Sequence, residues 1–187
     1  PDAIEPPQPA GLPPASNAMA EKLAVNRTGK LTGPQYRLAF LVGFGALVVL
    51  LCPAVMLIQT AALLLLDEAP APTLGGVIFT VLGVAFFILM LGLIGSNAYT
   101  FLIEAFMRRP VRVARGPLEV RVTEGDRPEL PFSYIVGDYS FAPYVAPRDL
   151  PMRTGAPYIV YYGARSRLLL SMAALDAPDA AQWEPEF

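Results

Sequence analysis

A block of 66 residues, 38–103, restricts what this chain can fold into more than any other feature. It contains no Lys or Arg, and its only acidic residues are the adjacent Asp67 and Glu68, whereas the other 28 charged side chains lie outside it. The uncharged stretches on either side of these acids are each longer than the roughly 20 apolar residues that a helix needs to cross a bilayer. The sequence therefore predicts two transmembrane helices, at about residues 38–66 and 73–107.

The segment between the two predicted helices, residues 67–72, holds two acids and two prolines, so it ends one helix and turns the chain. Basic residues lie only outside residues 38–103, and the loop of the resulting hairpin has none. Those near the ends of the hairpin are Lys22, Arg27, Lys30, Arg37, Arg108, Arg109, Arg112 and Arg115. Because basic residues favour the cytoplasmic side, we expect a protein of the bacterial inner (plasma) membrane with both termini cytoplasmic.

Polar side chains are sparse inside the predicted spans. Gly92, Ser96 and Thr100 recur at four-residue spacing, which makes a stripe of small residues on which another helix can pack closely. The first span is the expected partner, and another subunit is the alternative. Glu104 lies one turn before Arg108, which predicts an i,i+4 ion pair at the interface, with a proton or ion site as the alternative.

The N-terminal region predicts disorder rather than a folded element. Residues 1–18 contain six prolines and no hydrophobic period, so we expect a disordered Pro-rich arm over residues 1–25. The hairpin domain then covers residues 26–109. Thr32 is the predicted N-cap of the first span, with Pro34 in the first helical turn.

After the hairpin the pattern becomes alternating, with turn residues every eight to twelve positions. This predicts a β-module over residues 110–172, in which Gly137-Asp138 and the segment from Gly163 to Ser166 form hairpin turns. The predicted fold class is a membrane α-helical hairpin plus a small all-β C-terminal domain, an SH3-like or OB-like barrel. The expected strands are residues 111–113, 118–123, 132–136, 139–144, 158–162 and 168–172.

The C-terminal segment, residues 173–187, has four acids, no basic residue and two large aromatic side chains, Trp183 and Phe187. It is predicted to be an acidic, solvated tail. The alternative is that Trp183 and Phe187 dock into a basic, apolar groove on a partner or on the protein's own β-module.

The residue inventory disfavours catalysis. The chain has no His and a single Cys, Cys52, so imidazole chemistry, imidazole metal ligation and an internal disulfide are excluded. No glycine-rich phosphate loop is present, and the three carboxylates near Arg127 are typical of a solvated turn. We therefore expect no enzyme activity, no catalytic residues, no metal site and no cofactor. The module is rich in Tyr and Phe, but ten acids against eight Arg from Arg112 onward disfavour binding of nucleic acid.

Two stretches carry a resemblance to other proteins. They are Asn26-x-x-Gly29-x-Leu31-x-x-x-Gln35 and residues 158–171, Tyr-Ile-Val-Tyr-Tyr-Gly-Ala-Arg-Ser-Arg-Leu-Leu-Leu-Ser. They resemble a group of uncharacterised bacterial two-span membrane proteins with a cytoplasmic β-rich module. The resemblance extends over about residues 26–172 and implies the architecture, and it brings no activity with it.

Three functional hypotheses follow. The first is a non-enzymatic accessory or scaffold subunit of a larger membrane complex, whose partners are the lipid bilayer and other membrane subunits or further copies of itself. The second is a membrane-anchored sensor whose β-module binds a small ligand or a lipid headgroup. The third, a transporter or channel, requires polar groups at mid-membrane and a homo-oligomer.

Overall fold

The computed structural model describes residues 12–65, 74–122, 131–141 and 152–187, and these form two compact units. The hairpin unit is Tyr36–Phe106. The β unit combines the described residues of Pro1–Gln35 with those of Met107–Phe187. The β unit is therefore discontinuous in sequence, with the hairpin unit inserted between its two parts.

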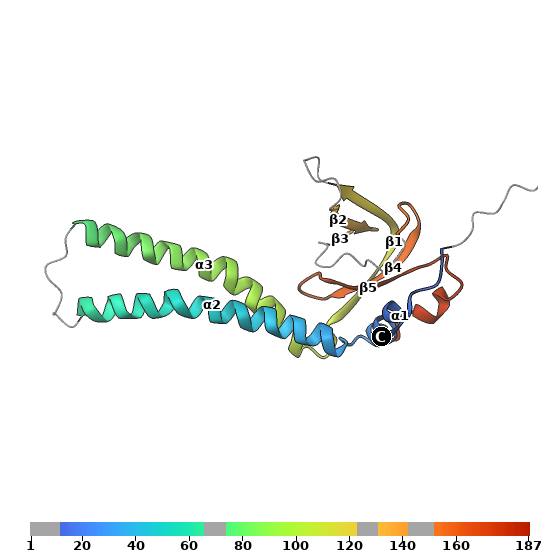
Figure 1. Cartoon of the computed structure of the whole chain (residues 1–187), viewed down its shortest axis with the longest axis horizontal. Helices are drawn as coiled ribbons and strands as arrows, with labels where there is room; N and C mark the ends of the chain where they lie inside the picture. The colour runs from blue at the N-terminus through green and yellow to red at the C-terminus, as the bar shows by residue number, and fades with distance from the viewer. Residues whose placement is uncertain (1–11, 66–73, 123–130, 142–151) are drawn as a thin grey trace, which may run out of the picture. The chain divides into compact units, whose positions relative to one another are not determined.

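Two helices of 33 residues each, α2 (Gly33–Leu65) and α3 (Leu74–Phe106), confirm the predicted helical hairpin. Each is about 50 Å long, and the two lie side by side in Figure 1. Both are long enough and apolar enough to cross a membrane. Helix α2 begins at Gly33, directly after the predicted N-cap. The predicted loop of residues 67–72 lies outside the described residues.

Small residues bring the two helices of the hairpin unit together. A Cβ atom added to Gly43 of α2 would lie 2.7 Å from Cγ of Leu102 in α3, and one added to Gly95 of α3 would lie 3.8 Å from Cδ1 of Leu50. Ala98 is only 1% exposed. Glycine and alanine let two helix backbones approach closely, so this contact depends on shape rather than on polar groups.

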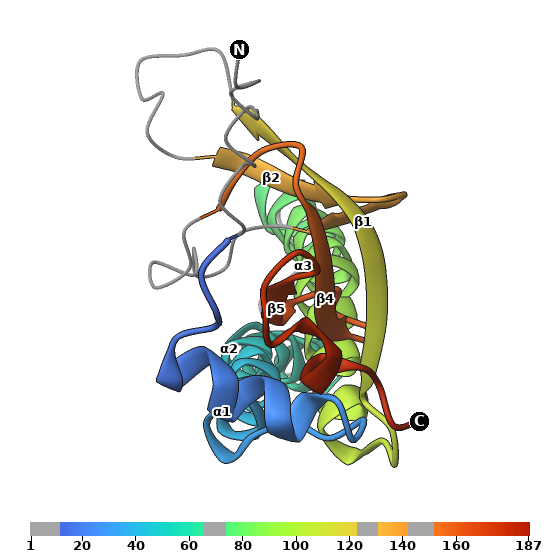
Figure 2. The same ribbon diagram turned by 90° about the vertical axis from the view of Figure 1, so that its right-hand side faces the viewer.

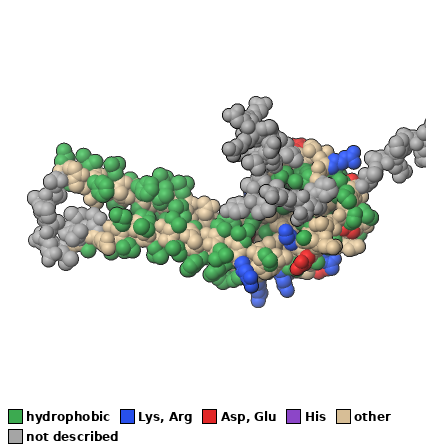
Figure 3. Space-filling view, viewed as in Figure 1, with side chains coloured by type: hydrophobic (Ala, Val, Ile, Leu, Met, Phe, Trp, Pro, Cys, Tyr) green, Lys and Arg blue, Asp and Glu red, His purple; other side chains and the backbone are tan. Residues whose placement is uncertain are grey.

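The outer surface of the hairpin unit carries large apolar side chains. Leu41, Ile58, Phe79 and Ile88 are all exposed, and hydrophobic side chains are spread along the visible face of the hairpin in Figure 3. An apolar surface of this extent marks contact with a membrane or with another protein.

The β unit contains one antiparallel sheet of five strands in the order β3-β2-β1-β4-β5. The strands are β1 (Val111–Val122), β2 (Pro131–Val136), β3 (Tyr139–Phe141), β4 (Pro157–Gly163) and β5 (Leu169–Ala174). The sheet confirms an all-β module, but the predicted barrel is wrong, because β3 and β5 do not pair and the sheet stays open. The sheet curls nevertheless, since the rings of Phe141 in β3 and Tyr162 in β4 are 5.1 Å apart.

Strand β1 joins what the sequence predicted as two strands. Its first half pairs with β4 and its second half with β2, so the chain passes through Gly116 without a break. A Cβ atom on Gly116 would lie 2.6 Å from the backbone of Gly137, and one on Gly137 would lie 2.6 Å from the carbonyl oxygen of Arg115. Two glycines are therefore required where β1 changes partner. Gly137 also supplies the positive φ, 59°, of the predicted β2–β3 turn.

The second predicted turn is confirmed as well, because Gly163 and Leu168 close the β4–β5 hairpin through a backbone hydrogen bond of 2.9 Å. The strand predictions for residue 123 and residues 142–144 lie outside the described residues.

A helix, α1 (Asn17–Asn26), lies where the sequence predicted a disordered arm, so that prediction is wrong for residues 17–25. Ser16 caps the helix, accepting a hydrogen bond from the backbone N–H of Met19. Met19, Leu23 and Asn26 share one face and are buried in the β unit. Figure 2 shows α1 and the C-terminal segment beside β4 and β5. Residues 1–11 lie outside the described part of the chain.

Strand β4 is buried along almost its whole length on both faces. An antiparallel sheet usually leaves one face to solvent, but here α1 and a short 3-10 helix, η1 (Ala180–Trp183), add cover to the sheet. The C-terminal segment is thus part of the folded β unit, and the prediction of a solvated tail is wrong.

Candidate functional site

A buried polar cluster lies where the chain leaves the β unit to start the hairpin. It consists of Asn26 at the end of α1, Gln35 in the first turn of α2 and Ser171 in β5, and we call it the polar clamp. Asn26 and Ser171 are fully buried, each 0% exposed. A buried polar group destabilises a fold unless its hydrogen bonds are satisfied, so the partners of these side chains decide what the cluster does.

Asn26 uses the full bonding capacity of its side chain. Its Nδ2 donates to Oε1 of Gln35 at 2.8 Å and to the carbonyl oxygen of Lys30 at 2.9 Å. Its Oδ1 accepts from Oγ of Ser171 at 2.7 Å and from Nε2 of Gln35 at 3.2 Å. The amides of Asn26 and Gln35 therefore bond to each other reciprocally, and together they join the α1 end to β5.

Gln35 bonds in three directions. Besides Asn26, its Nε2 donates to the carbonyl oxygen of Leu170 at 3.1 Å, while its Oε1 accepts from the backbone N–H of Thr32 at 2.9 Å. The hydroxyl of Thr32 accepts from the backbone N–H of Gln35 in return, which completes a capping box at the start of α2. One glutamine side chain thus caps a helix and binds a strand.

The carbonyl that Gln35 binds belongs to a β-bulge. In the β4–β5 register Tyr161 faces Ser171 and Tyr162 faces Leu169, so Leu170 has no partner residue in β4. A bulge leaves backbone groups outside the ladder, and the glutamine amide satisfies one of them. This explains why the clamp contacts β5 at this position.

The remaining residues of the first resemblance stretch shape the turn between α1 and α2. Gly29 has φ +81°, a conformation that favours glycine, and its backbone N–H donates to the carbonyl oxygen of Asn26 at 2.9 Å. Leu31 packs against the core of the β unit. The clamp therefore joins the two resemblance stretches: Asn26 and Gln35 come from one, and Ser171 comes from the other.

The C-terminal segment closes over the same turn. The guanidinium of Arg27 pairs with the Glu186 carboxylate at 2.6 Å and donates to the carbonyl oxygen of Gln182 at 2.6 Å. The backbone N–H of Glu186 donates to the carbonyl oxygen of Arg27 at 2.8 Å. Phe187 lies against Gly29, because a Cβ atom there would be 3.3 Å from its ring.

Trp183 and Phe187, the predicted docking residues, have different surroundings. Trp183 is buried; its indole N–H donates to the Asp179 carboxylate at 2.8 Å, and its carbonyl oxygen accepts from the hydroxyl of Tyr161 at 2.6 Å. Burial, reinforced by the Glu184 carboxylate, raises the pKa of Tyr161 to about 12. Phe187 remains 39% exposed. Trp183 thus packs on the protein's own β unit.

Two of the three predicted helix-packing residues, Gly92 and Ser96, lie outside the described contact between α2 and α3. Gly92 and Ser96 are exposed, and a Cβ atom on Gly92 would meet no described atom within 4 Å. The hydroxyls of Ser96 and Thr100 donate to carbonyl oxygens of their own helix. α2 packs instead through the glycine contacts given above. Glu104 is 1% exposed, and its ion pair with Arg108 stays a prediction.

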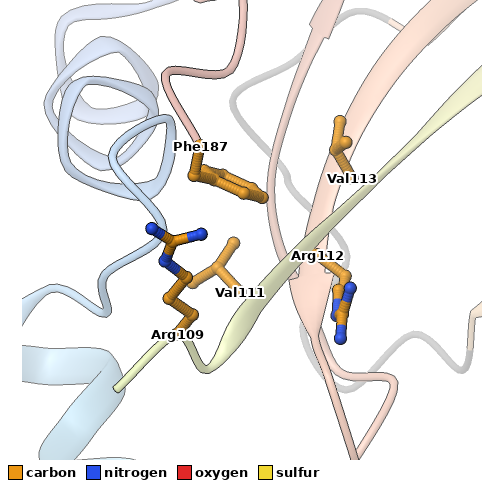
Figure 4. Close-up of a pocket in the computed structure, with 5 residues that line it drawn as sticks. All are labelled: Arg109, Val111, Arg112, Val113 and Phe187. Carbon is orange, nitrogen blue, oxygen red and sulfur yellow. The ribbon is translucent and has the colours of Figure 1, made fainter. Parts of the chain in front are cut away.

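A pocket of about 400 Å3 opens beside the start of β1 (Figure 4). Its lining residues are Arg109, Val111, Arg112, Val113 and Phe187. Within the described ranges, no group of three or more Cys, Asp or Glu side chains is placed to hold a metal ion.

The fold and the clamp define the class of this protein as a two-helix apolar hairpin inserted into a five-stranded β unit. Comparisons with protein-family models, curated proteins and solved structures gave no match to the chain.

Proposed function

We propose that the protein is a non-enzymatic accessory or scaffold subunit of a larger complex in the bacterial inner membrane. The hairpin anchors it there with both termini in the cytoplasm, and the β unit serves as a docking module. The observation that carries the proposal is the polar clamp, because it bonds residues that precede the hairpin to a residue that follows it. Both flanks of the hairpin therefore belong to the β unit.

A domain built in this way is held to its anchor at both ends. Gln35, a clamp residue, directly precedes Tyr36, the first residue of the hairpin unit. On the return side only four residues separate Phe106 from the start of β1. Short connections limit how far the β unit can move from the membrane, which suits a scaffold better than a module on a long tether.

The hairpin offers an apolar surface for lipid and for partner helices. Gly92, Ser96 and Thr100 form a stripe of small residues, of which Gly92 and Ser96 are exposed. A partner helix, from another subunit or a second copy, can approach closely on such a stripe.

Native mass spectrometry of the protein, extracted in mild detergent from the membrane of the cell that makes it, tests the proposal. We expect a complex heavier than the single chain. The variant Gly92→Leu should remove the partner, whereas the control Gly83→Leu should not. Gly83 lies nine residues earlier and therefore on the opposite face of α3, and a Cβ atom on either glycine would meet open space. A monodisperse single chain from its own membrane would contradict the proposal.

The sensor remains the second candidate, and the pocket beside β1 favours it because the guanidinium of Arg109 and the ring of Phe187 line it. Its test is a ligand-dependent rise in the melting temperature of the full chain. The full chain is needed because α1 is part of the β unit, so residues 110–187 alone lack a buried layer of the fold.

A further inference from the structure

We propose that the end of the sheet at which β1 begins is a binding site for the phosphate of anionic membrane lipids. The site rests on the membrane location in the proposed function and gives the β unit a specific ligand. It is formed by five arginines, which we call the basic end: Arg108, Arg109, Arg112, Arg165 and Arg167.

The topology of the sheet brings these arginines together from two distant stretches. Three of them surround the start of β1, and two lie in the β4–β5 turn. In the register Val111 pairs with Gly163, and the backbone N–H of Ala164 donates to the carbonyl oxygen of Pro110 at 2.8 Å. The turn is therefore fixed beside the residues that follow α3.

The two stretches that form the basic end carry no acidic residue of their own. Residues 105–118 and 158–175, which include all five arginines, contain no Asp or Glu. All five side chains are exposed. Two other arginines of the unit, Arg27 and Arg115, form ion pairs with glutamates of the C-terminal segment. Glu184 and Glu186 of the C-terminal segment thus pair with arginines outside the basic end.

One part of the basic end lies beside Tyr162, which is opposite Arg112 in the β1–β4 register. Burial raises the pKa of Tyr162, and Tyr139 raises it further, whereas Arg112 and Arg167 both lower it. Arginines from both stretches therefore add positive charge around the same side chain.

The other part is the pocket. Figure 4 shows Arg109, Val111 and Phe187 on one side of β1, whereas the guanidinium of Arg112 points away from them on the other side. The pocket thus presents a guanidinium beside an apolar surface of valine and phenylalanine. A guanidinium binds phosphate oxygens in a bidentate manner, and an adjacent apolar wall suits the glycerol and upper acyl chain of a lipid.

The short connection between α3 and the arginines favours a lipid headgroup over free phosphate as the source of the bound phosphate. Arg108 follows the last residue of α3, Phe106, by two positions, and Arg112 follows it by six. Six extended residues span at most about 21 Å, so a membrane-spanning α3 holds the basic end near the headgroups. Arginine clusters directly beside a membrane helix attract anionic lipids with a contribution from each charge.

The test is a native mass spectrometry titration of the purified full chain in mild detergent. Phosphatidylglycerol is compared with phosphatidylcholine of the same acyl chains, and we expect the anionic lipid to bind at least about tenfold more tightly. The double variant Arg109→Gln/Arg167→Gln, with one change from each stretch, should weaken phosphatidylglycerol binding about 20-fold. The control Lys22→Gln/Arg153→Gln removes two exposed charges elsewhere on the β unit and should change binding by less than about twofold.

Equal affinity of the unaltered chain for the two lipids would overturn the proposal without any variant. An equal loss in the control double variant would reduce it to general charge attraction, and displacement of the lipid by excess inorganic phosphate would assign the site to a free anion. Because the titration uses the isolated chain, its failure leaves the partner complex standing, and a missing partner complex leaves lipid binding standing.

Discussion

The two units satisfy their polar groups in opposite ways. In the hairpin unit Thr80, Ser96, Asn97 and Thr100 all donate to carbonyl oxygens three or four residues earlier in their own helix. In the β unit the polar clamp bonds Asn26 to Ser171, 145 residues away. These side chains of α3 therefore bond within their own helix, whereas the β unit needs both flanks of the hairpin. We expect polar substitutions to act locally in the hairpin and cooperatively in the β unit.

The largest expected effect comes from removing the clamp amide. Asn26→Leu removes one partner from each end of the Gln35 amide, the donor to the Lys30 carbonyl and the acceptor of the Ser171 hydroxyl. It should lower the free energy of unfolding of the β unit by about 4 kcal/mol. The single tryptophan, Trp183, is buried in this unit, so its fluorescence during chemical denaturation measures the effect.

Asn97→Leu is the matched change in the hairpin, because Asn97 is exposed and bonds only to its own helix. It should leave the Trp183 transition unchanged. Equal shifts from the two leucine variants would break the contrast between the units.

The next effect comes from backbone crowding in the sheet. Gly116→Ala places a Cβ atom 2.6 Å from the Gly137 backbone and should destabilise the β unit by about 3 kcal/mol, because backbone cannot rotate away. Gly155→Ala separates crowding from strain, since Gly155 has φ +84° but open space, and should cost about 1 kcal/mol. If Gly155→Ala cost as much in denaturant titration, strain alone would explain both.

Overpacking in the hairpin sharpens the comparison from the other side. Gly43→Leu forces a side chain against Leu102 and should cost the helix contact about 2 kcal/mol, whereas Gly45→Leu, which meets open space, should cost little. Thermal unfolding followed by far-ultraviolet circular dichroism should show a lower helical transition for Gly43→Leu only. The transition of the β unit, followed by Trp183 fluorescence, should keep its midpoint temperature. A shift of both transitions would show that the units unfold together.

The smallest effect concerns Tyr161. Tyr161→Phe removes the hydroxyl bond to the Trp183 carbonyl and should destabilise the β unit by about 1 kcal/mol at pH 7. Tyr161 ionises near pH 10 when unfolded and near 12 when folded, so its stabilisation is complete below pH 10 and is lost as the pH rises toward 12. The variant should therefore lose less stability than the wild type over this range in alkaline denaturation. Parallel curves would contradict the raised pKa.

The sequence could predict the elements that have a local cause. A long apolar run predicts a helix from its own length and composition. Gly137-Asp138 makes a tight turn because Gly137 adopts a positive φ. Thr32 and Gln35 stand at capping-box spacing, so the start of α2 was readable in full, although only Thr32 was identified as the cap.

The features that the sequence missed depend on distant contacts. The buried face of α1 is Met19, Leu23 and Asn26, and with a polar third member it gives too short an apolar stripe to indicate a helix. The acids of the C-terminal segment suggested solvation because Arg27 and Arg115, their partners, lie far away in the chain. Closure of the sheet likewise depends on whether its edges meet, and strand patterning does not determine that.

Hydrogen exchange of the full chain tests the central claim most directly, namely that both flanks of the hairpin build one cooperative β unit. The slowest amides of α1, around Leu23, should exchange with the same protection as those of β5, around Ser171, because they open together. Protection in α1 that is orders of magnitude lower than in β5 would mean that α1 is a detachable arm, and the account would be wrong.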